Sequence, residues 1–424
     1  MMMRVRVSLT LAMVLAMIAL AGCDHYVCNA TFGASSCTGG PLTLSQSGGG
    51  TANAAFVFAV DEGQSGATNG TIDGFTLDTS ANTFQAITSY TAPTIPSNNG
   101  GVGMVVAQKQ FLYAGFGNVG QLYGWSIDSS GNLTAIAGSP FLAPALDDFI
   151  GGVGQANMIT NPAGTFLYFS AGSVNGIYVY SIGSGGVLTQ VAGSPFSVPF
   201  PPMNLATDGL GKYLYAIDGD YFTHTGSEIQ AYSIGTSGAL TAVGSPLLTN
   251  MWQLQGEPTG KFMIGTSGNS AAPGFNTSGV DDLHLYTFSI GTTGALTEVG
   301  SFTTQYSPFS IAVSPNSGGN LVYSFSFNDT GTAFNSAEGY SISSTGTLTA
   351  LSGSPFSGLT DGSWGQFDQS GQFLIDYASY FDPTTSTTVT TLSPFDVGSG
   401  GALTQPISTL TLTTPGFWVV TDPQ

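Results

Sequence analysis

The sequence predicts an all-β fold, a seven-bladed β-propeller made of four-stranded sheets. Three observations lead to this prediction. One short pattern recurs along the chain at a period of about 53 residues. Turn-forming Gly is abundant, with 60 residues, and aromatic residues make up 12% of the chain. The two ends of the repeat region also look like two halves of one sheet. Gly-rich turns between aromatic strands are typical of an all-β body.

Each copy of the repeat centres on a strand in which an aromatic residue is followed, two positions later, by Ile, Leu or Val. In most copies a Gly/Ser turn and a Leu-Thr pair come next, as in Tyr178–Ile182 followed by Leu188 and Thr189. The aromatic residues that mark the copies are Phe75, Trp125, Tyr180, Tyr232, Phe288, Tyr340 and Phe395. One small sheet cannot bury both of its faces, so we expect seven sheets to stack radially with these aromatics packed between them.

Four strands are expected in each copy, counted outward from the axis. The innermost is short, as in Met203–Asp208, and the second follows a turn, as in Tyr213–Ile217. The third carries the marker aromatic. The fourth begins near Leu-Thr and often ends in Gly-Ser-Pro-Phe, as at Gly138–Phe141. Proline is tolerated there because an outer edge strand lacks a partner on one side.

The two ends of the repeat region complete one sheet. The region opens at Ala55–Phe58, a second strand with no innermost strand before it, and closes at Phe417–Pro423, an innermost strand with no second strand after it. We therefore predict a propeller over residues 54–424, closed by pairing of the C-terminal strand with the N-terminal blade.

The N-terminal residues predict export and a lipid anchor. Arg4 and Arg6 precede an apolar stretch too short for a comfortable membrane span, which is typical of a secretory signal. Leu20-Ala21-Gly22-Cys23 resembles the lipobox of bacterial lipoproteins. The resemblance implies a signal peptide over residues 1–22, a lipid on Cys23, and a membrane-anchored, extracytoplasmic location in the bacterial cell envelope.

Residues 23–53 are expected to hold the anchor and a flexible linker. Cys28 and Cys37 are the other cysteines of the chain, and an oxidising compartment would favour a disulfide between them. A redox or metal role is the alternative, although two cysteines without a nearby His pair make a poor zinc site.

The charge restricts the partners. The net charge is −19, and residues 24–424 contain Lys109, Lys212 and Lys261 but no Arg, against 24 acidic residues. Proteins bind nucleic acids and phosphates largely through Arg and Lys. The composition therefore argues against nucleic acid, anionic lipid and phosphorylated substrates.

The repeat resembles that of the seven-bladed β-propeller lactonase family, which includes 6-phosphogluconolactonase-like proteins. The resemblance rests on the Gly-x-x-Leu-Tyr turns at Gly164–Tyr168 and Gly211–Tyr215 and on the Tyr-Ser-Ile and Leu-Thr units, and it covers residues from about Ala54 to the end. It implies lactone hydrolysis by basic residues, His and a carboxylate on one face. Without Arg, the substrate is expected to be an unphosphorylated lactone.

Candidate site residues fall in the loops that would surround one mouth of the central channel. A binding or interaction scaffold for a neutral sugar, a cationic group or a partner protein is the first hypothesis. Its ligand-binding candidates are Asp147, Asp148, Trp252, Tyr306 and Trp364.

Two other hypotheses use the same mouth. The second is hydrolysis of an uncharged lactone, with His224 or His284 as general base beside Asp220 or Asp282. The third is a calcium site on paired carboxylates such as Asp147 and Asp148, although no pair has the spacing of a calcium loop. No other cofactor is expected.

Overall fold

The computed structural model describes residues 54–61, 69–78, 83–96, 101–116, 120–143, 158–171, 174–218, 227–267, 283–316, 320–326, 336–359, 362–382, 387–405, 407, 409–412 and 418–421. The predicted signal peptide, linker, lipidation site Cys23 and disulfide Cys28–Cys37 lie outside these residues. Across the described residues, no helix has the length and apolar character needed to cross a membrane.

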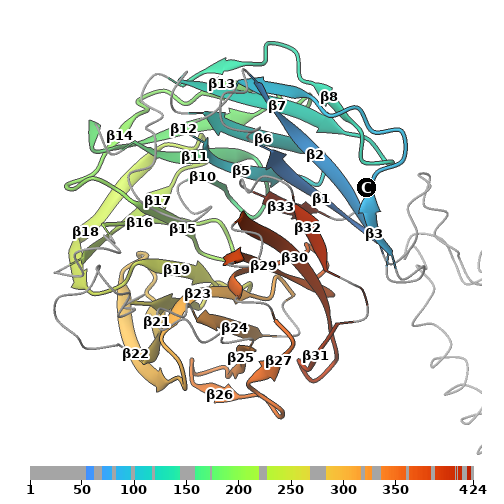
Figure 1. Ribbon diagram of the computed structural model, residues 1–424. Coiled ribbons are helices and arrows are strands. Elements are labelled where there is room, and N and C mark those ends of the chain that lie inside the picture. The colour runs from blue at the N-terminus through green and yellow to red at the C-terminus, as the bar shows by residue number, and fades with distance from the viewer. Residues whose placement is uncertain are drawn as a thin grey trace, which may run out of the picture. The chain divides into compact units, whose positions relative to one another are not determined.

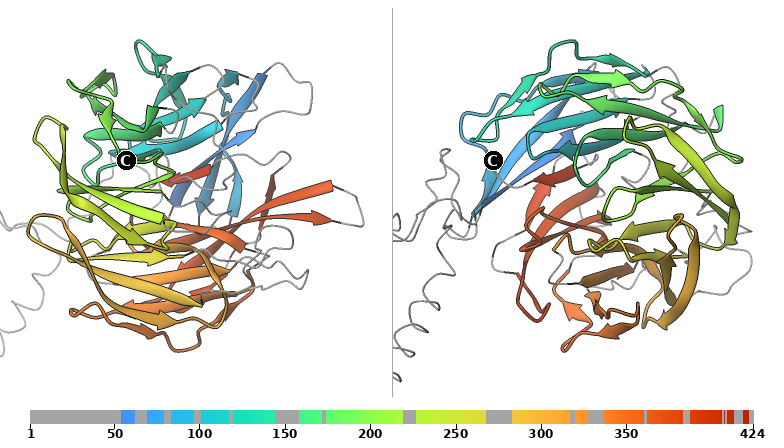
Figure 2. Two further views of the ribbon diagram at one scale, coloured as in Figure 1. Left: turned by 90° about the vertical axis from the view of Figure 1, so that its left-hand side faces the viewer. Right: turned by 180° about the vertical axis from the view of Figure 1, so that it is seen from behind.

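The described strands form seven antiparallel sheets arranged around a central axis (Figure 1). Each sheet is one blade, and we number the blades 1 to 7 in chain order of their second strands. In blades 2 to 7 the chain runs from the innermost to the outermost strand before it leaves the blade, whereas in blade 1 it runs outward from the second strand and returns at its end to supply the innermost one; the two further views show the blades following one another around the ring (Figure 2). The predicted seven-bladed propeller is confirmed.

The strands nearest the axis are short. The innermost strands of blades 1 to 7 are, in order, β33 (Trp418–Thr421), β5 (Gly101–Ala107), β10 (Met158–Thr160), β15 (Asn204–Thr207), β19 (Gln253–Gly256), β23 (Pro308–Val313) and β28 (Gly362–Phe367). The second strands are β1 (Ala54–Asp61), β6 (Phe111–Phe116), β11 (Phe166–Ala171), β16 (Tyr213–Ile217), β20 (Phe262–Thr266), β24 (Leu321–Ser326) and β29 (Phe373–Asp382).

The third strands carry the marker aromatics. They are β2 (Asn69–Asp78), β7 (Gln121–Ile127), β12 (Gly176–Ile182), β17 (Ser227–Ile234), β21 (His284–Ile290), β25 (Ser336–Ile342) and β30 (Thr387–Val397).

The outermost strand is continuous in blades 4 and 5 and divided into two short strands in the other five blades. The divided outermost strands are β3 (Thr83–Ala86) with β4 (Thr94–Pro96) in blade 1, β8 (Leu133–Ala135) with β9 (Phe141–Leu142) in blade 2, and β13 (Leu188–Gln190) with β14 (Phe196–Ser197) in blade 3. Blade 6 has β26 (Leu348–Ala350) with β27 (Phe356–Ser357), and blade 7 has β31 (Leu403–Thr404) with β32 (Leu410–Leu412). The continuous ones are β18 (Leu240–Thr249) in blade 4 and β22 (Leu296–Thr303) in blade 5. In blades 2, 3 and 6 the Gly-Ser-Pro-Phe sequence makes the division, so that motif interrupts the outer strand where the sequence predicted its end.

The ring closes as predicted. The C-terminal strand β33 pairs antiparallel with β1, with Phe56 opposite Thr421 and Ala59 opposite Trp418. The first and last parts of the propeller therefore share blade 1, in which β33 is the innermost strand.

The core lies between the blades. Within the described residues there are seven clusters of buried apolar side chains, and each cluster joins two neighbouring blades. Strand β1 illustrates the cause: Phe56 and Phe58 pack against blade 2, whereas Val57 packs against blade 7. The second strands are largely apolar because both of their faces are buried, although they also contain a few buried polar residues such as Ser170, Ser324 and Asp376.

Tyrosines of the second strands link neighbouring blades at the turns between third and fourth strands. The hydroxyl groups of Tyr113, Tyr215 and Tyr323 each donate to a glycine carbonyl oxygen in the following blade, at 2.6, 3.0 and 2.5 Å. These acceptors are Gly186, Gly294 and Gly401. The repeated bond fixes the spacing of the blades.

Antiparallel pairing divides the connections between two faces. The turn face carries the tight turns between first and second and between third and fourth strands, such as 208–213 and 183–187. The loop face carries the connections between second and third strands and between blades.

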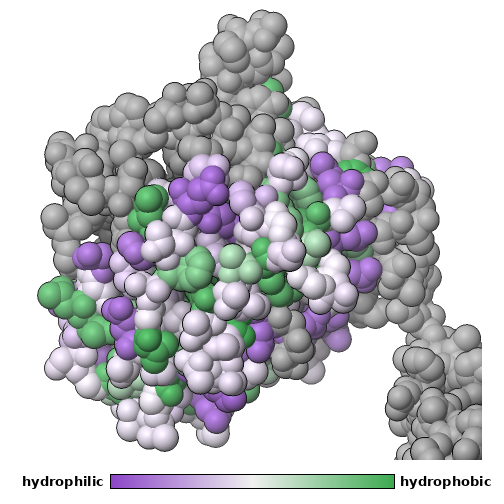
Figure 3. Space-filling view, turned by 90° about the horizontal axis from the view of Figure 1, so that it is seen from below, coloured by the Kyte–Doolittle hydropathy of each residue, from purple (hydrophilic) through white to green (hydrophobic). Residues whose placement is uncertain are grey.

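Hydrophobic side chains on the described surface are scattered. On the side shown in Figure 3 they form small separate groups among polar residues. The large exposed hydrophobic residues are Leu142, Val174, Val187, Leu210, Leu248 and Val299, which belong to different strands and turns. Such scattering is normal for a folded surface and marks no docking site by itself.

Candidate functional site

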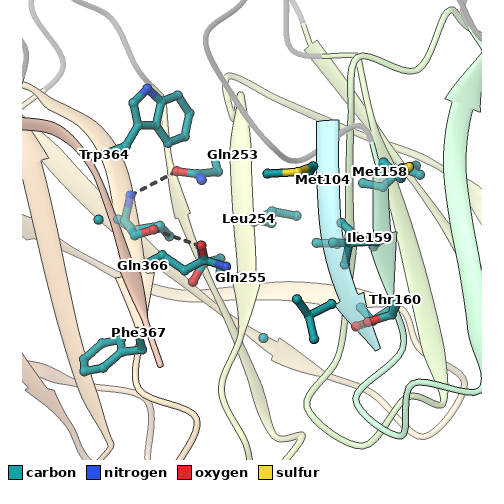
Figure 4. A pocket seen from close by; sticks show the side chains of 18 of the residues that line it. Met104, Met158, Ile159, Thr160, Gln253, Leu254, Gln255, Trp364, Gln366 and Phe367 are labelled. Atoms are coloured by element: carbon teal, nitrogen blue, oxygen red, sulfur yellow. Dashed lines mark hydrogen bonds between the residues drawn. The ribbon is translucent and has the colours of Figure 1, made fainter. Parts of the chain in front are cut away.

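The central channel holds a cavity of about 380 Å³ that is lined by the innermost strands (Figure 4). The lining residues are Met104, Val105, Val106, Met158, Ile159, Thr160, Leu205, Ala206, Thr207, Gln253, Leu254, Gln255, Gly256, Ile311, Trp364, Gly365, Gln366, Phe367 and Gln369. None of these lining residues carries a charge. The polar side chains are four glutamines and two threonines, so the cavity offers uncharged hydrogen-bonding groups beside apolar ones.

The inner edge of each blade requires hydrogen-bond partners, because an innermost strand is paired on one side only and unmet backbone groups are costly when buried. In blade 5 two glutamine side chains form hydrogen bonds with the innermost strand of blade 6 (Figure 4). The Ile311 amide donates to Gln253 Oε1 at 3.0 Å, and the Val313 amide donates to Gln255 Oε1 at 2.9 Å. Gln255 Nε2 donates to the Ile311 carbonyl oxygen at 2.8 Å. These glutamines therefore join β19 to β23.

Other side chains make the same kind of bond, always from one blade to the next. Asn204 Nδ2 donates to the Trp252 carbonyl oxygen at 2.7 Å, and Trp252 Nε1 donates to the Phe309 carbonyl oxygen at 2.8 Å. Near the turn face, Gln108 Nε2 donates to the Gly164 carbonyl oxygen at 2.9 Å. Much of the polar character of the inner wall therefore serves to hold the ring together.

Gln366 in blade 7 differs from Gln255. Each precedes by two residues the buried carboxylate of its turn, Glu257 in blade 5 and Asp368 in blade 7. The two glutamines thus hold equivalent positions in their blades. Gln366 Oε1, however, is buried and accepts no hydrogen bond.

Three aromatic rings meet at the loop-face end of the channel. The ring centroids of Trp252 and Phe309 lie 5.2 Å apart, and those of Trp252 and Trp364 lie 5.8 Å apart. Phe309 and Trp364 lie 5.3 Å apart in an edge-to-face arrangement. Trp252 and Phe309 are buried, whereas Trp364 is half-buried and borders the cavity.

The predicted ligand residues have different surroundings. Trp252 and Trp364 pack together, and only Trp364 lines the cavity. Tyr306 lies in the connection between blades 5 and 6, where its hydroxyl group accepts a 2.8 Å bond from Gln305 Nε2, and it does not line the cavity. Asp147 and Asp148 lie outside the described residues.

The predicted catalytic residues are mostly outside the described part of the chain as well, since Asp220, His224 and Asp282 are not in it. His284 is the first residue of β21, a third strand, and its ring lies beside Tyr286 with Thr303 Oγ1 3.3 Å from Nε2. It does not border the channel cavity, which innermost strands line. The described residues contain no group of three or more His, Cys, Asp or Glu side chains suited to hold a metal ion.

Buried carboxylates brace the turns, a role that sequence reasoning missed. Asp208, Glu257 and Asp368 are each 1% exposed. Their carboxylates accept the backbone amides of the residues five positions ahead, Tyr213, Phe262 and Phe373, at 2.7, 3.1 and 2.8 Å. The signal that could have found them is an acid placed five residues before the aromatic that begins a second strand.

Glu338 is a further buried carboxylate whose role was not predicted. It accepts the backbone amides of Gln305 and Tyr306 at 3.0 Å and the hydroxyl group of Tyr340 at 2.5 Å. Burial raises the pKa of Tyr340 well above its ordinary value, and the hydrogen bond to Glu338 raises it further. Glu338 thereby fixes the connection that leads into β23 and Phe309.

Comparisons with known proteins agree on the fold. No protein-family model matches the sequence, and no curated protein matches it. Several solved structures are similar. One is a proposed 6-phosphogluconolactonase from Bacteroides uniformis, with a TM-score of 0.58 and 15% identity, covering 87% of this chain and 100% of that one. Another is the periplasmic gluconolactonase PpgL of Pseudomonas aeruginosa, with a TM-score of 0.57 and 15% identity, covering 88% and 100%.

A third similar structure, a proposed 6-phosphogluconolactonase from Bacteroides fragilis, has a TM-score of 0.55 and 16% identity, covering 87% of this chain and 98% of that one. At these identities the comparison establishes the fold alone. The predicted resemblance to the lactonase propellers is thus confirmed at the level of fold.

Proposed function

We propose that this protein is a lipid-anchored binding module of the bacterial cell envelope that takes a small, uncharged, polar ligand into its central channel. The observation that carries this proposal is the lining of the cavity, which combines glutamine and threonine side chains with Trp364 and includes no charged group among the described residues. Cavities of a few hundred Å³ with a few placed polar groups are typical of small-molecule sites.

The charge of the chain supports an uncharged ligand. An anion would approach a protein with a net charge of −19 against a repulsive field, and residues 24–424 hold no Arg to bind a phosphate bidentately. A cation would be attracted from a distance, but the described lining gives it no carboxylate. A neutral sugar or a neutral lactone meets neither obstacle.

Isothermal titration calorimetry tests the proposal. The probes are methyl glucoside, glucose and glucono-δ-lactone as neutral ligands, and 6-phosphogluconate as the charged comparator. We expect saturable binding of at least one neutral probe and none of 6-phosphogluconate. Binding of 6-phosphogluconate alone, or of none of the four, would contradict the proposal.

Hydrolysis of an uncharged lactone is the second candidate, because the similar structure PpgL is named as a gluconolactonase and gluconolactone carries no charge. The described lining contains no His, Asp or Glu, so a general base would have to come from the loop face, with His224, His284, Asp220 and Asp282 as the candidates. A pH-stat assay with glucono-δ-lactone tests this. If the protein does not exceed the buffer rate, hydrolysis is ruled out; if His224→Ala and His284→Ala both keep the rate, a histidine base is ruled out.

The lipid anchor is proposed from the lipobox-like sequence ending in Cys23. Labelled palmitate fed to producing cells should enter the wild-type protein and not the Cys23→Ser variant. Equal labelling of both proteins would contradict an anchor at Cys23.

A further inference from the structure

We infer that β28 of blade 7 is the recognition strand of the channel and that its ligand is a sugar ring, stacked on Trp364 and hydrogen-bonded to Gln366. The inference rests on the proposed binding function and adds the ligand class and the residues that select it. Equivalent glutamines of blades 5 and 7, Gln255 and Gln366, differ in the hydrogen bonds they make.

The glutamines of blade 5 are already engaged. Gln255 uses its oxygen for the Val313 amide and its nitrogen for the Ile311 carbonyl oxygen, and Gln253 uses its oxygen for the Ile311 amide. Turning either side chain toward a ligand would break these bonds and leave backbone groups of β23 unpaired, which costs more than an ordinary hydrogen bond returns. Gln253 and Gln255 therefore serve to join β19 to β23 and are not free to bind a ligand.

The side-chain oxygen of Gln366 makes no such hydrogen bond. Gln366 holds the position of Gln255, two residues before the turn carboxylate, yet Oε1 accepts no hydrogen bond. The terminal torsion of a glutamine side chain is soft, so rotation of the amide toward the cavity costs little. A buried acceptor without a partner also favours a ligand that supplies a donor, such as a hydroxyl group.

Trp364 supplies a flat apolar surface beside this amide. Its ring makes edge-to-face contacts with Trp252, at an interplanar angle of 62°, and with Phe309, at 76°. Both of these neighbours are buried, so they hold the indole plane in place. Because Trp364 also borders the cavity, part of its surface is available to a ligand.

The spacing of the two residues suits one small ring. Trp364 and Gln366 are two positions apart on β28 and therefore lie on the same side of the strand, about 7 Å apart along it. Between them, a Cβ on Gly365 would lie 2.0 Å from Phe325 Cζ, so β28 packs closely against blade 6 and only glycine fits there. A ring on Trp364 would place its rim near the Gln366 amide.

The rest of the cavity also suits a sugar. Across the channel from β28 the wall presents Met104, Met158, Ile159 and Leu254 (Figure 4). A sugar ring has apolar C–H faces and hydroxyl groups around its rim. One face would lie on Trp364 and the other would meet this apolar wall, while the rim would face Gln366 and, farther toward the turn face, Gln369.

Binding measurements on single variants test the inference. The probes are methyl glucoside, methyl galactoside and methyl mannoside as rings, with sorbitol as the open-chain comparator. We expect the wild type to bind at least one ring and to bind sorbitol at least about tenfold more weakly, because an open chain gives up flexible torsions and offers no flat face. Gln366→Leu and Trp364→Leu should each weaken ring binding about tenfold or more.

Gln230→Leu is the control, with the same substitution at a buried glutamine of β17 that does not line the cavity and whose Nε2 donates to the Ala231 and Val243 carbonyl oxygens. It should lower the melting temperature and change ring affinity less than about twofold, whereas Gln366→Leu should leave the melting temperature nearly unchanged. Trp364→Phe covers the case in which Trp364→Leu fails to fold, and it should retain part of the affinity.

The outcomes separate the two proposals. If the wild type binds glucono-δ-lactone or glucose but Gln366→Leu and Trp364→Phe bind as tightly as the wild type, the channel binds ligands and the role of β28 is overturned. If sorbitol binds as tightly as the rings, the ring requirement is overturned. If no neutral probe binds, the proposed function fails and this inference fails with it.

Discussion

Gly186, in the turn between the third and fourth strands of blade 3, lies directly against the ring of Phe111 in blade 2. A Cβ added to Gly186 would be 2.6 Å from Phe111 Cδ1, and the residue has a φ of 76°, in the left-handed region. The carbonyl oxygen of the same glycine accepts the hydroxyl group of Tyr113. One glycine thus makes both the apolar and the polar contact that join two blades.

Alanine at this glycine should loosen the joint. Gly186→Ala should lower the free energy of unfolding by about 2–4 kcal/mol, since it combines left-handed backbone strain with overpacking against Phe111. The control is Gly185→Ala, because a Cβ at Gly185 meets no atom within 4 Å. Urea denaturation of both variants measures the difference. Equal stability of the two variants would show that the turn adapts freely.

Loss of a turn carboxylate should also destabilise the fold. Glu257→Ala would leave the backbone amides of Thr259, Lys261 and Phe262 without their acceptor. We expect a loss of about 2–4 kcal/mol in the free energy of unfolding, measured by urea denaturation, since several donors lose a charged partner at once. Glu298→Ala, at an exposed position of β22, should cost little; a similar loss in both variants would contradict a bracing role for Glu257.

High pH should weaken the fold through buried tyrosines. Burial, with a contribution from Tyr178, raises the pKa of Tyr180 to about 12, and burial raises the pKa of Tyr232 to about 12. In the unfolded chain a tyrosine titrates near pH 10. The stability that the neutral phenols provide is therefore complete below about pH 10 and is lost as the pH rises from there toward 12.

Melting temperatures from pH 7 to 11 test this dependence. The wild type should lose stability steeply above about pH 10, and Tyr180→Phe should lose less over the same interval because it has one fewer phenol to ionise. At pH 7 the variant should be slightly less stable, because it lacks the 2.8 Å bond to the Leu142 carbonyl oxygen. Parallel pH profiles for the two proteins would contradict the prediction.

Removal of the C-terminal strand should open the ring. Deletion of residues 416–424 removes β33, which leaves one edge of β1 unpaired and takes the innermost strand from blade 1. We expect the truncated chain to aggregate or to unfold, as judged by size-exclusion chromatography and circular dichroism. Deletion of 422–424, beyond β33, is the control and should leave a folded monomeric species. A folded 416–424 deletion would show that closure is dispensable.

The blades could be predicted from the sequence because their repeat follows from packing. Phe56 and Val57 face different neighbours, so most positions of a second strand must be apolar, and aromatics such as Tyr180 and Phe288 recur where two blades meet. The same residue types are therefore required at the same turn and buried positions of each blade, and they recur in the sequence at the period of the blades. The closure was predictable for the same reason, because an incomplete copy stands at each end.

The polar interior could not be predicted in the same way. A glutamine in an innermost strand can serve the wall, like Gln255, or remain uncommitted, like Gln366, and the two occur in similar sequence contexts. The difference depends on which backbone the next blade presents. Glu338 likewise acts on residues more than thirty positions earlier in the chain, and no local pattern records that contact.

Candidate loop residues illustrate a related limit. Sequence position assigned His284 to the channel mouth, whereas the structure places it at the start of β21, with its ring beside Tyr286 and Thr303 of blade 5. Trp252 and Trp364 were both proposed as ligand residues, but the packing of Phe309 and Trp364 buries the first and leaves only the second at the cavity. These residues differ in how far their side chains lie from the propeller axis. That distance depends on strand order and on how neighbouring blades pack.

A crystal structure of the protein soaked with methyl glucoside tests the central claim most directly. We expect density for one sugar ring inside the channel, with a ring face on Trp364 and a hydroxyl group within hydrogen-bond distance of the Gln366 amide. Sugar bound outside the channel, or a channel that excludes the sugar at concentrations that saturate binding in solution, would contradict it.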